Sequence, residues 1–280
     1  MAIGDSTRIN TNIAAFNALN ALKTVNRNLE VSQLRLATGR RINEVADDPA
    51  GFTISKRLEA RSRGLSVAFD NVGTAKNVLS IAEGGLINIS DILITIKEKV
   101  TQAASDTLGP SERNAIKNEI DQLVTEVDDI VSETTFNDIA LINGTYSASY
   151  QTGEGSGDTL VVALTQSASS TALAITSTYV SSKVSNATDA AGALTNVDAA
   201  IETVSGVLQE VGAYNARLST KESTLSIAIT NTEATRSRIL DADIASEQLN
   251  ATRYLILQQT ATAQLAQANI TPQNVLALFT

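Results

Sequence analysis

Apolar residues recur along this chain at alternating spacings of three and four, which is typical of helices that pack along one side. The longest such run holds one heptad register through Leu79, Ala82, Leu86, Ile89, Leu93, Ile96, Val100 and Ala103. Gly109 and Pro110 end this segment, and Ser111 is placed to cap the next. There the alternation resumes at Ile116, Ile120, Leu123, Val127 and Ile130. Two sequential heptad helices joined by a short Gly-Pro turn predict an antiparallel pair.

A third periodic tract begins near Gly192. Its register includes Val197, Ile201, Val204, Leu208, Val211, Leu218, Leu225 and Ile229. Asn215 and Glu222 occupy two positions of the same register, where polar residues often fix how helices align. No Pro interrupts the tract, so we expect a helix over about 193–235, roughly 60 Å long at about 1.5 Å per residue. The pattern predicts a mainly α fold: an elongated antiparallel coiled-coil or helical bundle formed by the N- and C-terminal regions.

Residues 144–192 differ in character from the helical tracts. Residues 145–157 are rich in Ser, Gly, Tyr and Thr, as turns are. Leu160, Val162 and Leu164 alternate with other residues, and residues 173–176 have the composition of a second strand. We predict a small β-rich, hairpin-like insertion that faces solvent. Its Ser and Thr side chains would form a plain polar surface or carry O-linked sugars.

The two ends of the chain are almost free of charge. No charged residue occurs between Ile9 and Leu22, or from Tyr254 to Thr280. Heptad spacing continues near the C-terminus through Ala251, Tyr254, Gln258, Ala261, Leu265 and Ala268. Such a helix is poorly soluble alone, and it lacks the basic face of a membrane-surface helix. We also find no stretch that resembles a membrane span. The pattern predicts a terminal helix that is complete only when packed against other chains.

The composition excludes several kinds of chemistry. The chain has no His and no Cys, which rules out Cys/His zinc sites, thiolate nucleophiles and a histidine general base. Carboxylate metal sites and lysine chemistry remain open, but no Gly-rich phosphate loop or clustered acid pair supports an enzyme. We predict no enzymatic activity and no cofactor. The first residues also lack the basic start and apolar run of a cleavable signal peptide, which fits either a cytoplasmic protein or a dedicated export route.

Charge is distributed unevenly. Residues 1–70 hold ten basic and seven acidic side chains, whereas the remainder holds 11 basic and 23 acidic ones. A net +3 head and a net −12 body would attract one another between neighbouring copies of the chain. The basic head would alternatively bind nucleic acid, but Phe16, Phe52 and Phe69 are too scattered to form a stacking platform. We therefore expect no nucleic-acid partner.

Several short motifs resemble the bacterial flagellin family when taken in order. They are Arg8 to Ile13 with Asn17 and Leu19, Ala37-Thr38-Gly39, Arg41-Ile42-Asn43, Ala46 to Gly51, Ala82 to Leu86, Thr135-Phe136-Asn137, Ser237-Arg238-Ile239 with Asp241 and Asp243, Gln267-Ala268-Asn269, and Pro272-Gln273 with Val275-Leu276. The resemblance covers about residues 8–145 and 193–279. Each motif is weak alone, but their common order is specific.

The resemblance implies a domain layout. Residues 1–42 and 239–280 would form the two halves of an inner core domain. Residues 43–143 and 193–238 would form the two parts of a helical rod domain. Residues 144–192 would be a short variable surface insertion.

The resemblance also implies a function. The chain would be a structural subunit that polymerises into the extracellular flagellar filament used for swimming. It would be exported unfolded through the flagellar secretion apparatus, without a cleavable signal peptide, after an export chaperone had covered its C-terminal helix. Its partners would be further copies of itself and the filament cap and junction proteins. The alternative within the same structural class is a hook–filament junction protein.

Two groups of residues are candidates for functional roles. We expect subunit assembly to use Ile9, Ile13, Phe16, Leu19, Leu255, Leu265, Ala268, Val275 and Leu276. The alternative is that these residues fill an intramolecular coiled coil. Asp47, Asp48, Pro49 and Gly51 would form the bent connection between core and rod, because Pro fixes its own φ and restricts the preceding residue. Asp suits a turn or cap, which explains both Asp residues without the alternative of a carboxylate metal site. Asp241 and Asp243 indicate a similar break before the last helix.

The sequence departs from the family pattern at two places. Asp138 stands where the family usually has Gly after Phe-Asn, so the turn there must tolerate a side chain. Residues 93–99 resemble the stretch that Toll-like receptors read in many flagellins, but Thr95 and Lys99 replace an expected Arg and Leu. The resemblance therefore predicts no innate-immune receptor contact. The absence of His also excludes the zinc protease that some relatives carry in the insertion.

Overall fold

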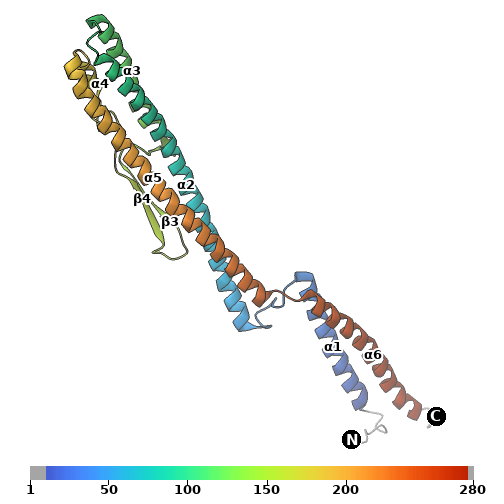
Figure 1. Ribbon diagram of the computed structural model, residues 1–280. Coiled ribbons are helices and arrows are strands. Elements are labelled where there is room, and N and C mark those ends of the chain that lie inside the picture. Colours follow the sequence, from blue (N-terminus) through green and yellow to red (C-terminus); the bar gives the residue numbers. More distant parts are fainter. Residues whose placement is uncertain (1–10, 277–280) are drawn as a thin grey trace. The chain divides into compact units, whose positions relative to one another are not determined.

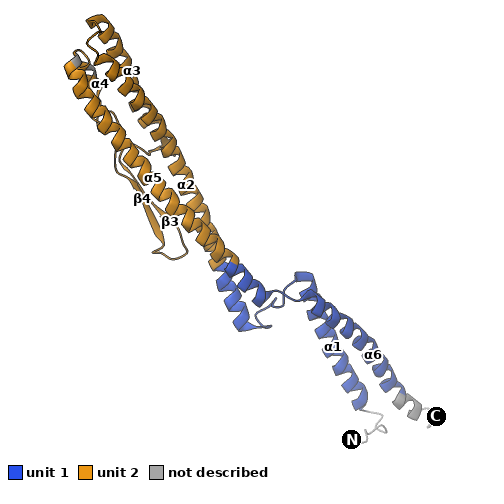
Figure 2. Ribbon diagram, viewed as in Figure 1, with its two compact units in different colours: residues 1–60, 231–280 blue, residues 61–230 orange. Residues whose placement is uncertain are grey.

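The structure, a computed structural model, describes residues 11–276, apart from the side chains of residues 181, 187 and 271–276. The chain forms two compact units (Figure 2): unit 1 consists of residues 1–60 and 231–280, and unit 2 of residues 61–230. The helices are α1 (Ile13–Thr38), α2 (Pro49–Ala103), α3 (Pro110–Glu133), α4 (Ser177–Lys183), α5 (Ala187–Leu240) and α6 (Ile244–Leu276). The mainly α fold with a small β insertion is the predicted one (Figure 1).

Unit 2 is held together by the predicted heptad stripes. The stripe from Leu79 to Ala103 on α2 is buried against buried residues of α3 and α5 in one continuous core. Ion pairs fix the helix directions: Lys76 and Lys97 of α2 contact Glu222 and Asp198 of α5, each at 2.7 Å. Residue numbers rise along α2 as they fall along α5, so these two helices are antiparallel. Asn215 and Glu222 of the predicted register are only half-buried.

Two small antiparallel sheets lie between α3 and α4, the first just before the predicted insertion, which starts at residue 144, and the second within it. Strands β1 (Thr135–Phe136) and β2 (Ile139–Ala140) form one, and β3 (Tyr146–Gln151) and β4 (Thr159–Leu164) form the other. One face of the second sheet buries Tyr146, Leu160 and Val162, while Val161 is exposed on the opposite face. The insertion therefore has a core-facing side as well as a solvent-facing side.

The predicted second strand at residues 173–176 is wrong. This segment is a tight turn in which Ala174 has a φ of 55° and Ile175 donates its N–H to the Ser170 carbonyl at 3.0 Å. The partner of β4 is β3, which lies in the Ser-rich stretch interpreted as turns. In β3, Tyr146, Ala148 and Tyr150 alternate with more polar residues, so the period-two signal was present but masked by small polar side chains.

The α2–α3 turn differs from the predicted one. Helix α2 ends at Ala103, and α3 begins at Pro110 with Gly109 as its N-cap, so Ser111 lies inside the helix and is not a cap. The turn is bound by Arg113, which is only 8% exposed. Its guanidinium donates to the carbonyls of Ala103 and Ser105, both at 2.7 Å, and to that of Leu108 at 3.3 Å. The start of α3 therefore has no side-chain cap, and the buried Arg113 instead satisfies carbonyls at the end of α2 and in the turn.

Hydropathy alone misjudges α2. This helix includes an 18-residue window of mean hydropathy 1.5, long and apolar enough to cross a membrane, so our finding that no stretch qualifies is wrong by that criterion. Its heptad stripe lies in the core of unit 2, where Leu86, Leu93 and Ile96 are fully buried. Packing in this core accounts for the apolar residues of the stripe, whereas Ile81, Ile87 and Ile94 of the same helix are exposed.

The β1–β2 turn provides a first prediction. Asn137 and Asp138 both have positive φ, at 51° and 63°, as in the type I′ turn that favours Asn-Gly. Replacing Asp138 with Gly removes a left-handed penalty of about 1–2 kcal/mol, offset in part by the entropy of Gly. We expect the free energy of unfolding to rise by about 0.5–1 kcal/mol in urea titrations. Asp138→Ala is the control and should instead lower it; equal values for both variants would contradict this account.

Candidate assembly surface and connection

The terminal helices α1 and α6 of unit 1 form an antiparallel pair (Figure 1). Three polar contacts mark the register along it. Asn12 Nδ2 donates to the Ala268 carbonyl at 2.8 Å, and Gln258 Nε2 donates to Asn26 Oδ1 at 2.9 Å. At the other end of the pair, Arg35 Nη1 contacts Glu247 Oε1 at 3.2 Å. The seam between these helices is thus aligned by polar groups.

Small residues alternate with larger ones along the seam. On α6 the seam positions are Glu247, Ala251, Tyr254, Gln258, Ala261, Leu265 and Ala268, and on α1 they include Ala15, Ala18, Leu22, Val25, Leu29, Ser32 and Leu36, all buried or half-buried. Small residues let two helices approach closely but bury little apolar area each. The polar contacts therefore carry much of the specificity of this pair.

The predicted assembly residues divide into two sets. Leu19, Leu265 and Ala268 are half-buried along the pair. Ile13, Phe16 and Leu255 are exposed, by 54%, 63% and 43%. Ile9 lies outside the described residues, as do the side chains of Val275 and Leu276. The structure therefore separates residues that serve the intramolecular pair from apolar residues that are left without cover.

Sequence reasoning missed a second apolar stripe on α6. Leu249, Ile256, Ala263 and Ile270, here called the outer stripe, are seven residues apart and all exposed, Leu249 by 71% and Ile256 by 57%. They are offset by two residues from the seam register, about 200° around the helix, so they face away from α1. The seven-residue repeat was visible in the sequence, but the seam register alone was followed.

Unit 1 is poorly filled on its own. Among its described residues the buried apolar side chains are Leu29, Ile42, Leu240 and Ala251, against 37 in the core of unit 2. Eleven large apolar side chains of unit 1 are exposed. Large exposed apolar areas mark sites of protein–protein contact. The terminal helices therefore have the surface of an element that is buried by other molecules.

Two short segments connect the helices of unit 1. Residues 39–48 join α1 to α2, and residues 241–243 join α5 to α6. Gly39 ends α1 in the left-handed conformation, at a φ of 68°. The segments pair with each other: Arg41 N–H donates to the Leu240 carbonyl at 2.7 Å and Ala242 N–H to the Gly39 carbonyl at 2.9 Å. Asp243 Oδ1 then accepts from the N–H of Ala245 at 3.0 Å, at the start of α6.

Asp47, Asp48, Pro49 and Gly51 all lie in or next to the first connection. Asp48 caps α2, because its Oδ1 accepts from the Gly51 N–H at 2.9 Å. Pro49 is the first residue of α2, where the missing N–H has no cost. A Cβ on Gly51 would lie 2.7 Å from Ile42 Cδ1 and closer still to the Asp48 carboxylate. Any side chain at position 51 would therefore displace the cap or the buried Ile42.

Asp47 folds the same segment back on itself. Its Oδ2 accepts from the N–H groups of Asn43 at 2.9 Å and Glu44 at 3.1 Å. These two hydrogen bonds, and to a lesser extent the charge of Arg35, lower the pKa of the Asp47 carboxyl. Among the described residues no group of three His, Cys, Asp or Glu is placed to hold a metal ion, and turn chemistry accounts for both Asp residues.

The lowered pKa of Asp47 gives a signed pH prediction. A carboxyl whose folded pKa is lowered stabilises the fold above its unfolded pKa, about 3.9, and that stability is lost as the pH falls through the folded pKa. We expect Asp47→Asn to lower the free energy of unfolding at pH 7 by at most about 1 kcal/mol, because the group is exposed and screened. The variant and the original chain should converge as the pH falls through the lowered pKa of Asp47. A difference that persists unchanged to pH 2 would contradict the charge-based account.

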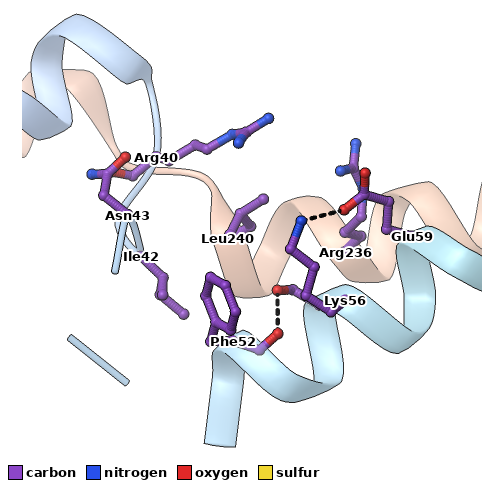
Figure 3. Close-up of a pocket in the computed structure, with 9 residues that line it drawn as sticks. Arg40, Ile42, Asn43, Phe52, Lys56, Glu59, Arg236 and Leu240 are labelled. Carbon is purple, nitrogen blue, oxygen red and sulfur yellow. Dashed lines mark hydrogen bonds and ion pairs between the residues drawn. The ribbon is translucent and has the colours of Figure 1, made fainter. Parts of the chain in front are cut away.

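A cavity of about 250 Å³ lies beside the connection in unit 1 (Figure 3). Its lining residues come from three segments and are Arg40, Ile42, Asn43, Phe52, Ser55, Lys56, Glu59, Arg236 and Leu240. Lys56 Nζ contacts Glu59 Oε2 at 2.9 Å, and Arg236 pairs with Glu233 at the same distance. The cavity is thus polar and carries more basic than acidic side chains.

Comparison with known proteins assigns the family. The model of the bacterial flagellin N-terminal helical region matches residues 9–147, and that of the C-terminal helical region matches residues 194–279. A flagellin of Halalkalibacterium halodurans is 35% identical over 269 residues, covering 94% of this chain and 97% of the relative. A flagellar filament 31.3 kDa core protein of Treponema maltophilum is 31% identical over 288 residues, covering 97% and 99%. The chain therefore belongs to the bacterial flagellin family, as the resemblance indicated.

A solved structure shares the fold. It is a protein of Vibrio parahaemolyticus assigned as flagellar hook-associated, with a TM-score of 0.58 and 15% identity, covering 70% of this chain and all of that one. At this identity the likeness shows a common fold and no more.

Proposed function

We propose that this chain is the structural subunit of a bacterial flagellar filament and assembles by burying its terminal helices between copies. The observation that carries the proposal is α6, which has no charge from Tyr254 onward and exposes the outer stripe on the face away from α1. An apolar face at strict seven-residue spacing is the pattern that packs against further helices. In a filament, neighbouring copies supply those helices.

The main filament subunit is favoured over the junction-protein alternative. Both flagellin family models match, and the named relatives are flagellins and filament core proteins that align over nearly the whole chain. The likeness to the hook-associated protein rests on fold alone, at 15% identity. A structural subunit also needs no catalytic centre, which agrees with a chain that has neither His nor Cys.

The uncharged C-terminal residues 254–280 also bear on how the chain is exported. A long uncharged helix with exposed apolar residues would aggregate in the cytoplasm unless covered. An export chaperone that binds α6 would prevent this, and passage through the flagellar export apparatus in unfolded form would deliver the chain to its extracellular site. Filament cap and junction proteins would then meet the same terminal helices.

Contact with Toll-like receptors is not part of the proposed function. In the stretch that resembles the receptor-binding segment, Lys97 pairs with Asp198 at 2.7 Å and Lys99 pairs with Glu119 at 2.6 Å. Both lysines are thus engaged within unit 2, and neither offers the forked geometry of Arg.

The test is seeded elongation followed by electron microscopy. The purified full chain is added to short filament seeds, beside a version that lacks residues 254–280. We expect long tubular filaments from the full chain only, because the deletion removes most of α6 while leaving the core of unit 2 intact. A full chain that stays monomeric on competent seeds would exclude the main-subunit function and favour the junction protein.

A further inference from the structure

The cavity beside the connection is positively charged. Among the described residues that line it, Arg40, Lys56 and Arg236 are basic and Glu59 is acidic, which gives these lining residues a net charge of +2. Figure 3 shows Arg40 and Asn43 on the connecting segment, with Lys56, Glu59 and Arg236 across the cavity from them. A cavity lined in this way attracts carboxylates.

One of these cations has no partner. Lys56 and Arg236 each pair with a glutamate, at 2.9 Å. The guanidinium of Arg40 is exposed and makes no hydrogen bond or ion pair among the described residues; only the backbone of Arg40 is engaged. A guanidinium can bind a carboxylate through two parallel hydrogen bonds. Arg40 is therefore free to bind an acidic side chain from another molecule.

Complementary charge lies on α3 of unit 2. Unit 1 has 11 basic and 10 acidic residues, which leaves 10 basic and 20 acidic residues for unit 2. Helix α3 alone has seven acidic and two basic residues in 24, so half of the net charge of unit 2 lies on this one helix. Glu126, Asp129 and Glu133, here called the acidic stripe, are exposed at spacings of three and four. Their carboxylates have no ion pair among the described residues.

We propose that the acidic stripe of one copy docks at the Arg40 cavity of another copy. The contact deepens the proposed function, on which it rests, by naming an electrostatic contact between subunits that is separate from the terminal helices. Charge complementarity selects a second copy as the occupant, since this chain supplies both halves. Because exposed charges act mainly on the rate of association, the contact should be strongest at low salt.

Charge reversal tests the proposal in the full chain. We expect Arg40→Glu to slow seeded elongation about tenfold at low salt, with little effect at high salt. The triple variant Glu126→Lys, Asp129→Lys and Glu133→Lys should slow it similarly, and a chain with all four changes should recover most of the rate. Arg57→Glu is the matched control, with the same charge change in unit 1 at an exposed residue outside the cavity. Arg40→Glu at the original rate, or no recovery in the fourfold variant, would overturn the proposal.

Cross-linking shows whether the contact joins two copies. The chain has no Cys, so Arg40→Cys and Asp129→Cys each introduce a single thiol. Filaments grown from a mixture of the two and treated with a short bismaleimide should yield a dimer that neither variant yields alone. Gln209→Cys, on an exposed position of α5, should give no dimer with Arg40→Cys. Absence of the mixed dimer overturns the contact while filament growth continues, whereas failure of the original chain to elongate overturns the proposed function itself.

Discussion

Replacing Arg113 with Ala is expected to lower the free energy of unfolding by about 3 kcal/mol. The guanidinium is buried and satisfies three carbonyls at the end of α2 and in the following turn. Truncation removes the guanidinium donor from the Ala103 and Leu108 carbonyls and leaves the Ser105 carbonyl only the Leu108 N–H at 3.4 Å, and an unsatisfied buried polar group costs about 1–3 kcal/mol. Two of the three hydrogen bonds, at 2.7 Å, have the short length of charge-assisted bonds. The measurement is urea unfolding of the full chain, followed by circular dichroism.

The same site distinguishes geometry from charge. Arg113→Lys keeps the positive charge, but one ammonium cannot reproduce the fork that reaches Ala103, Ser105 and Leu108. We expect it to lose more than half as much stability as Arg113→Ala. Lys117→Ala, one turn further along α3, is the matched control and should change the stability by less than about 0.5 kcal/mol. A loss that small in Arg113→Ala would show that the turn holds without its buried cation.

The spacing of apolar residues predicted the helices in which buried positions recur at heptad intervals. Every member of the stripe from Leu79 to Ala103 is buried in the core to which α3 and α5 also contribute. The cap at Asp48 was also within reach, since a cap depends on residues three positions away. Local spacing contains enough information for both features, and the structure places them as the pattern indicated.

Other features depend on contacts distant in sequence. Tyr146 was interpreted as part of a turn, because its burial arises from packing against the core and not from its Ser-rich neighbours. The Arg41 N–H donates to the Leu240 carbonyl, 199 positions away in the sequence. A hydrogen bond over that separation cannot be predicted from neighbouring residues. Arg113 was not predicted to be buried, because a charged residue in a helical tract is normally interpreted as solvent-facing. The seven-residue repeat of the α6 outer stripe is present in the sequence, but the prediction followed only the register of the seam.

Converting the outer stripe of α6 to a polar face is expected to abolish filament growth without unfolding the subunit. Leu249→Asn and Ile256→Asn together remove two exposed apolar side chains that assembly would bury. Burial of each contributes about 1.5–3 kcal/mol, and every 1.4 kcal/mol is a factor of ten. The critical concentration for elongation should therefore rise more than a hundredfold. Because both side chains are exposed in the subunit, by 71% and 57%, its unfolding midpoint should change little.

The control introduces the same residue type on the same helix, at polar positions that flank the outer stripe, without removing an apolar side chain. Thr252 and Gln259 are also exposed on α6 and seven residues apart, and both are already polar. Thr252→Asn with Gln259→Asn should elongate from seeds at the original critical concentration. If the outer-stripe variant elongates equally well, the stripe is not an assembly surface, and the exposed Ile13, Phe16 and Leu255 would have to supply the contact. If it fails and the control grows, the face of α6 turned away from α1 is the surface that neighbouring subunits bury.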